Sequence, residues 1–168
     1  MTFWGTGRRS AGRWLLAGLG LTLLPLRLTA QGPIIVEWGL HGTVAIVDSL
    51  RVGVVAGPRL ALRTLGGTRA VASFGAGVRG DSAMARAEAA IEYQVSPRAA
   101  GRATFYFGGG LAGVVGSRRG GYLLLYLGLE KSPGLPSGWA IEAGLGGGFR
   151  LRAAYHWRRF PRGWRPQG

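Results

Sequence analysis

The chain has no cysteine, only two histidines and a single lysine among its 168 residues. Without cysteine it can form neither a disulfide nor a metal site with thiolate ligands. The two histidines, His41 and His156, give thin support for a metal site built on imidazole. We therefore expect no metal ion and no other cofactor.

Acidic residues are also scarce, with 7 against 21 basic residues, which gives a formal net charge of +14. A surplus of this size often marks a protein that binds nucleic acid. Here, however, the arginines are spread singly along the chain instead of being clustered in one patch. We therefore expect no nucleic-acid partner.

Long apolar runs are missing except near the N-terminus. Residues 14–25 are apolar, follow three arginines and precede a small residue, Ala30, at a plausible cleavage site. Because Pro25 ends the run, it is shorter than the about 20 apolar residues of a membrane-spanning helix. The pattern predicts a cleavable signal peptide over residues 1–30, with an uncleaved N-terminal anchor as the alternative.

After Gln31 the chain shows no helical periodicity of useful length, but apolar and polar residues alternate. In one segment Ala87, Ala89 and Ile91 alternate with Glu88 and Glu92, which places the two sets on opposite faces of a strand. Eight such segments span about residues 34–46, 51–63, 69–79, 84–95, 104–115, 122–130, 139–145 and 149–157.

The connections between these segments are short and rich in Gly, Pro, Ser and Asp, as at Gly80-Asp81. Such connections predict antiparallel hairpins in a meander, and eight strands in a meander can close into a barrel without free edges. We predict an all-β fold, an eight-stranded antiparallel up-and-down transmembrane β-barrel over residues 31–160. A basic tail rich in Pro and Gly follows at residues 161–168. The arginines near the C-terminus, Arg158, Arg159, Arg162 and Arg165, would project beyond the barrel, either toward anionic headgroups or as a disordered tail, and we expect disorder.

The apolar face could line the inside of a secreted, soluble, lipocalin-like barrel, or it could face lipid in an outer-membrane barrel. If the odd-numbered strands all begin at one rim, seven aromatic residues of this face gather at that rim. An aromatic belt of this kind is typical of a membrane interface and favours the second barrel. Its predicted members are Trp38, Tyr93, Phe105, Phe107, Trp139, Tyr155 and Trp157.

The polar face carries glutamate and arginine but no lysine. Arginine suits paired, partly buried networks with carboxylates, and an eight-stranded barrel is just wide enough for side chains to fill it. We therefore predict an interior plugged by Arg–Glu pairs. The predicted members of this network are Glu37, His41, Arg51, Arg59, Arg63, Arg86, Glu88, Glu92, Glu130, Glu142, Arg150, Arg152 and His156.

From about Ile34 to Phe160 the pattern resembles the small eight-stranded outer-membrane β-barrel proteins of diderm bacteria. The last segment carries spaced hydrophobic residues and an aromatic end, Phe149, Tyr155 and Trp157, similar to the C-terminal strand of that family, although here a basic segment from Arg158 onward follows it. The resemblance implies location in the bacterial outer membrane, recognition by the barrel-assembly machinery, and contact with outer-membrane lipid. Arg118 and Arg119 would then lie in an extracellular connection. Their guanidiniums could donate to lipopolysaccharide phosphates, or the connection could be an ordinary solvated turn.

No pattern points to catalysis. The glycine runs 108–110 and 146–148 lie within or between strands, so they do not form a phosphate-binding loop. The two histidines lie on the polar face, where a His–Glu hydrogen bond is expected. We predict a structural, envelope or interaction role without enzymatic activity. The alternatives are the soluble ligand-binding barrel and a lipid-modifying outer-membrane enzyme; no oligomeric state is predicted.

Overall fold

A computed structural model describes residues 33–47, 51–116 and 119–167, without the side chains of Val47 and Arg51. The predicted signal peptide, residues 1–30, and Arg118 lie outside the described residues. Within these residues no helix is long and apolar enough to cross a membrane.

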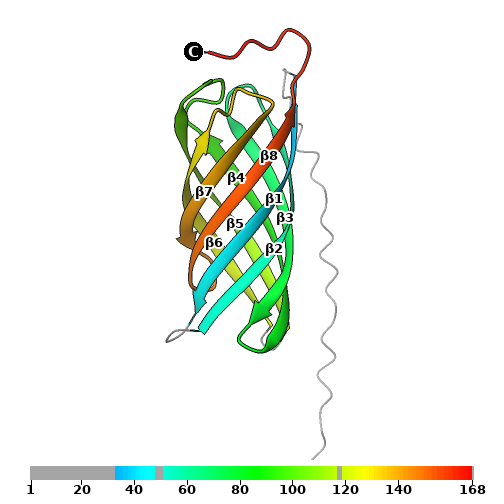
Figure 1. Ribbon diagram of the computed structural model, residues 1–168, viewed down its shortest axis with the longest axis vertical. Coiled ribbons are helices and arrows are strands. Elements are labelled where there is room, and N and C mark those ends of the chain that lie inside the picture. The colour runs from blue at the N-terminus through cyan, green and yellow to red at the C-terminus, as the bar shows by residue number, and fades with distance from the viewer. Residues whose placement is uncertain (1–32, 48–50, 117–118, 168) are drawn as a thin grey trace, which may run out of the picture. The chain divides into compact units, whose positions relative to one another are not determined.

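Eight strands form one closed antiparallel barrel, in which each strand pairs with the next and the first pairs with the last (Figure 1). The seam runs from Val36 opposite Arg159 to Ile46 opposite Phe149. The predicted eight-stranded meander is therefore confirmed. The strands are β1 (Ile35–Val47), β2 (Arg51–Arg63), β3 (Thr68–Arg79), β4 (Ser82–Gln94), β5 (Ala103–Gly116), β6 (Gly120–Lys131), β7 (Ser137–Leu145) and β8 (Phe149–Arg159).

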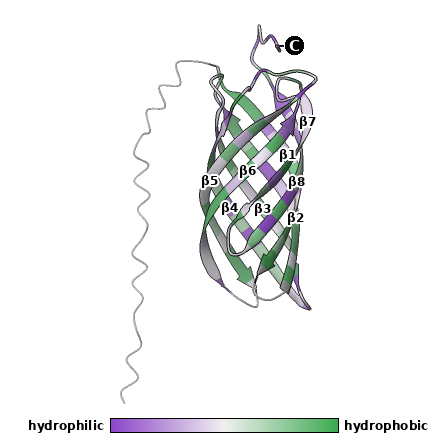
Figure 2. Cartoon of the chain, turned by 90° about the vertical axis from the view of Figure 1, so that its left-hand side faces the viewer, coloured by the Kyte–Doolittle hydropathy of each residue, from purple (hydrophilic) through white to green (hydrophobic). Residues whose placement is uncertain are grey.

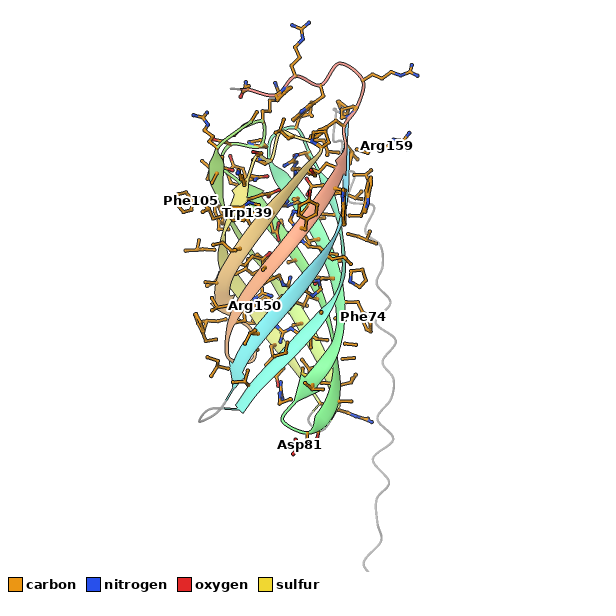
Figure 3. The ribbon with its side chains drawn as sticks, viewed as in Figure 1. Phe74, Asp81, Phe105, Trp139, Arg150 and Arg159 are labelled. Atoms are coloured by element: carbon orange, nitrogen blue, oxygen red, sulfur yellow. The ribbon has the colours of Figure 1, made fainter. Side chains whose placement is uncertain are left out.

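The two ends of the barrel differ in their connections. At one end, called the turn end, β3 joins β4 through Gly80-Asp81 and β7 joins β8 through residues 146–148. At the other, called the terminal end, β1 begins and β8 ends, and longer connections cover residues 95–102 and 132–136. Figure 3 shows Asp81 at the turn end and Arg159 at the terminal end.

The alternation of the sequence becomes an alternation between the inside and the outside of the barrel. Along β8 every second residue is buried, from Arg150 to Arg158, and the residues between them are exposed. Leu124 is 4% exposed while its neighbour Leu125 is 67% exposed. Figure 2 shows the same alternation as hydrophilic and hydrophobic bands along the strands. The outer surface is thus apolar, and the interior holds the charged residues.

The interior is not uniform along the barrel. Toward the turn end it is filled by apolar side chains, with Val55, Met84 and Val114 packed together and Tyr122 against them. From the middle to the terminal end it is filled by arginine, glutamate and tyrosine. The candidate site is therefore this charged part of the interior together with the outer face around it.

Candidate functional site

The layer nearest the terminal end is built on Glu37 of β1 and Glu130 of β6. Glu37 Oε1 lies 3.0 Å from Arg63 Nε as an ion pair, and Glu37 Oε2 accepts from Arg69 Nη1 at 2.9 Å. Glu130 contacts the same Arg69 group at 3.1 Å and is also bound by Arg158 of β8. Three guanidinium groups from three strands thus share two buried carboxylates.

The middle layer is built on Glu92 of β4 and Glu142 of β7. Arg59 of β2 lies between them and binds both carboxylates. Glu92 Oε2 also lies 2.6 Å from Arg69 Nε as an ion pair, and Glu92 Oε1 accepts from the Tyr126 hydroxyl at 2.7 Å. Arg59 bridges the two carboxylates of this layer, and Arg69 joins Glu92 to Glu37 and Glu130 of the first layer, so the two layers form one continuous network.

The third layer is built on Glu88 of β4, whose carboxylate is bound by three guanidinium groups. Arg86 Nε lies 2.6 Å from it, Arg152 Nη2 2.5 Å and Arg150 Nη1 3.0 Å. The Ser73 hydroxyl donates to it at 3.2 Å. Glu88 therefore gathers three guanidiniums and a hydroxyl at the boundary with the apolar part of the interior.

Two tyrosines of β5 and β6 lie between the charged layers, and each lies over a glycine of the other strand. Tyr106 opposes Gly128 and Tyr126 opposes Gly108 in the β5–β6 register. A Cβ on Gly128 would lie 2.2 Å from Tyr106 Cζ, and one on Gly108 would lie 2.7 Å from Tyr126 Cζ. Glycine at these two positions leaves the room that the rings occupy.

The tyrosine rings also face the arginines. The Arg69 guanidinium lies 5.1 Å from the Tyr106 ring centroid, and that of Arg150 lies 4.5 Å from the ring of Tyr126. The aromatic faces attract cations at these distances. The tyrosines therefore act both as packing and as additional neutral partners for the arginines.

Positive charge exceeds negative charge in the interior. Among the described side chains, seven buried arginines (Arg59, Arg63, Arg69, Arg86, Arg150, Arg152, Arg158) accompany five buried glutamates. Buried charges are tolerated only when they are paired and hydrogen-bonded. Each glutamate is shared between several guanidiniums, and tyrosine rings face two of the arginines. In this way the interior accommodates its surplus of positive charge.

The histidines take no direct part in the ion pairs of the arginines. His41 is buried on β1, and His156 Nδ1 lies 3.5 Å from Glu130 Oε1 without a hydrogen bond. The predicted pairing of a histidine with a glutamate corresponds to this contact between His156 and Glu130. One cluster has the atoms that could bind a metal ion within 4.8 Å of one another: Glu37, Glu130 and His156. Its two carboxylates, however, are already paired with arginine, namely Arg63, Arg69 and Arg158. A divalent cation there would meet three guanidiniums, so this cluster is unsuited to a metal.

All predicted network residues with described side chains are buried in the interior, and all except His41 take part in ion pairs there. The Arg51 side chain lies outside the described part of the structure. Two central members were not anticipated, Arg69 and Arg158. Arg69 lies at the start of β3, whose alternation is weak because both faces carry small residues. The expectation that Arg158 belongs to a projecting tail is wrong: it is the last inward residue of β8, and it donates to the Leu135 carbonyl as well as to Glu130.

All seven aromatic residues of the predicted belt are exposed on the outer face near the terminal end. The register places Trp38 opposite Trp157, Trp139 opposite Tyr155 and Tyr93 opposite Phe107. Figure 3 shows Phe105 and Trp139 on the outside, at the same end as Arg159. The aromatic rings therefore form a band on the outside of the charged interior.

The C-terminal segment was expected to be disordered, and this is wrong. The rings of Phe160 and Trp164 stack with centroids 4.6 Å apart, and Trp164 Nε1 donates to the Gly134 carbonyl at 3.0 Å. Gln167 exchanges backbone hydrogen bonds with the 95–102 connection, donating to the Arg98 carbonyl and accepting from the Ala100 N–H. Residues 160–167 are thus fastened to two connections at the terminal end (Figure 1).

Comparison with models of known protein families gives no match for this chain, and a search of curated proteins also gives none. The arguments for function therefore rest on the barrel itself.

Proposed function

We propose that this chain is an integral β-barrel protein of the bacterial outer membrane with a structural, envelope or interaction role. Its terminal end faces the periplasm, its interior is plugged by arginine and glutamate, and it performs no catalysis. The observation that carries the proposal is the inversion of the barrel, which exposes apolar residues and buries charged ones.

The outer face supports contact with lipid. Large apolar side chains such as Leu123, Leu127 and Phe105 are 79%, 68% and 69% exposed. A water-soluble protein rarely exposes so continuous an apolar surface, whereas hydrocarbon is its natural solvent. The aromatic band at one rim matches the position that Trp and Tyr take at the membrane–water interface. A soluble ligand-binding barrel would need the reverse arrangement, with its apolar residues inside.

The interior supports a plugged barrel. The ion pairs join β1, β2, β3, β4, β6, β7 and β8 across the lumen, and β5 adds the ring of Tyr106. A water-filled channel would need these contacts to open. A lipid-modifying enzyme would need a histidine that lipid can reach, but His41 and His156 are 5% and 2% exposed, inside the barrel.

Membrane insertion can be tested by expressing the full chain in a diderm bacterium and fractionating the envelope. We expect the protein in the outer-membrane fraction, resistant to carbonate extraction and soluble only in detergent. Single cysteines at Leu124 and Leu125 then test the faces, because no native cysteine interferes. A lipid-soluble probe should label Leu125→Cys and not Leu124→Cys. Recovery of the protein in the soluble periplasmic fraction, or equal labelling of the two, would contradict the proposal.

A further inference from the structure

The two ends of the barrel carry different surface charge. The terminal end carries six basic side chains that are exposed or half-buried, here called the basic collar: Arg98, Arg102, Lys131, Arg159, Arg162 and Arg165. No exposed acidic residue accompanies them in the described part of the chain, because all five glutamates are buried. The turn end presents both signs, with Asp81 beside Arg79 and Arg119. The exposed charge of the terminal end is therefore purely positive.

The basic collar is built on ordered chain. Arg162 and Arg165 flank Trp164, whose ring stacks on Phe160 and whose Nε1 is bound to Gly134. The guanidinium of Arg98 lies 5.5 Å from the centroid of the same Trp164 ring. These contacts hold the basic groups at the rim of the barrel. A freely moving tail would instead carry them away from the rim.

The basic collar also continues the outward rows of the strands. On β8 the outward residues run Tyr155, Trp157 and Arg159, and on β6 they end in Leu129 and Lys131. Successive outward residues on a strand are about 7 Å apart. Arg159 and Lys131 therefore lie one step beyond the aromatic and apolar band, at the depth where lipid phosphates begin if the band marks the membrane interface.

From these observations we propose that the basic collar binds the headgroups of anionic phospholipids in the leaflet at the terminal end. The inference rests on the proposed membrane insertion. Guanidinium groups donate paired hydrogen bonds to phosphate oxygens, and Arg159 and Lys131 lie where such phosphates would surround the barrel. The surrounding lipid is thus enriched in phosphatidylglycerol-type headgroups on this side.

The test uses the full chain reconstituted in phosphatidylcholine vesicles with trace spin-labelled lipid. Electron spin resonance measures the association of labelled phosphatidylglycerol relative to labelled phosphatidylcholine. We expect a preference of about fivefold or more, the effect of one basic residue near an anionic surface. Combined Arg102→Gln, Lys131→Gln, Arg159→Gln and Arg162→Gln should bring the ratio close to one. Arg119→Gln, at the turn end, should leave it unchanged.

Folding of each variant is checked by its circular dichroism and by the mobility of unheated protein on a gel. An inserted wild-type protein without lipid preference, or a collar variant that keeps the wild-type ratio, would overturn the inference and leave the proposed function intact. An inserted wild-type protein without lipid preference is also the result expected if the basic collar binds an acidic protein instead of lipid. Failure to insert into vesicles would overturn both.

Discussion

The surplus of buried arginine makes a specific prediction about Glu88 and Arg86. Glu88→Gln keeps the shape of the side chain but removes the carboxylate that Arg86, Arg150 and Arg152 share. Arg150 and Arg152 retain Glu142 at 2.8 and 3.8 Å. Arg86 loses its one ion pair among the described residues. Because this leaves a buried charge without a partner, we expect Glu88→Gln to lower the free energy of unfolding by about 3–5 kcal/mol.

Arg86→Gln breaks the same ion pair from the other side but has a smaller expected cost. Glu88 keeps Arg150 and Arg152, and the positive surplus of the interior falls by one. We expect a loss of about 1.5–3 kcal/mol, the cost of hydrogen bonds to a charged group.

Urea unfolding in lipid vesicles, followed by tryptophan fluorescence and by the gel mobility of unheated samples, measures both costs. The Glu88→Gln, Arg86→Gln double variant completes the cycle and should be more stable than Glu88→Gln alone, because it removes the stranded guanidinium. Equal costs for the two single variants, or a larger cost for Arg86→Gln, would refute the argument from charge surplus.

Three further predictions follow from the packing and the faces. Gly128→Ala should destabilise the barrel by about 1–3 kcal/mol because the new methyl group meets the Tyr106 ring, whereas Gly42→Ala, with nothing within 4 Å, should cost little; comparable urea midpoints for the two would contradict this. Leu125→Arg should cost about 2–4 kcal/mol in vesicle unfolding if the residue lies near the bilayer midplane, and the idea of a lipid-facing row fails if the cost is negligible. Planar-bilayer recording of the pure protein should show no steady conductance, and a stable open channel would mean that water fills the interior.

The strands were predictable because a period of two leaves little freedom. Once Glu88 and Glu92 share a face with Arg86, every odd-numbered residue between them is assigned to the other face, and glycine-rich turns mark where each strand ends. The predicted segments accordingly end within two residues of the strands in the structure. The assignment was weakest on β3, where Ala70 and Ala72 alternate with Val71 and give little contrast, and there Arg69 was overlooked.

The partners of each charge were not predictable. Arginine has a long, flexible stem, so Arg59 can reach Glu92 and Glu142 on two other strands, neither of which is its neighbour in the sheet. The order of the C-terminal segment was also missed, because its fastening depends on two connections distant in the chain, around Arg98 and Gly134. Both results depend on how the barrel closes, and local pattern does not contain that information.

The charged interior also has a consequence for the order of folding. The contact between Arg59 and Glu142 joins residues 83 positions apart, that between Arg150 and Glu88 62 positions, and that between Arg152 and Thr43 109 positions. Within single hairpins Arg59 and Arg158 have no carboxylate partner, because their glutamates lie on strands outside those hairpins. A half-formed sheet that enters hydrocarbon therefore bears the cost of exposing these charges there. Closure of the β1–β8 seam and neutralisation of the interior therefore occur together, which makes the transition cooperative. If the barrel inserts into a membrane as proposed, we expect open intermediates to be confined to water or to an assembly factor that shields them.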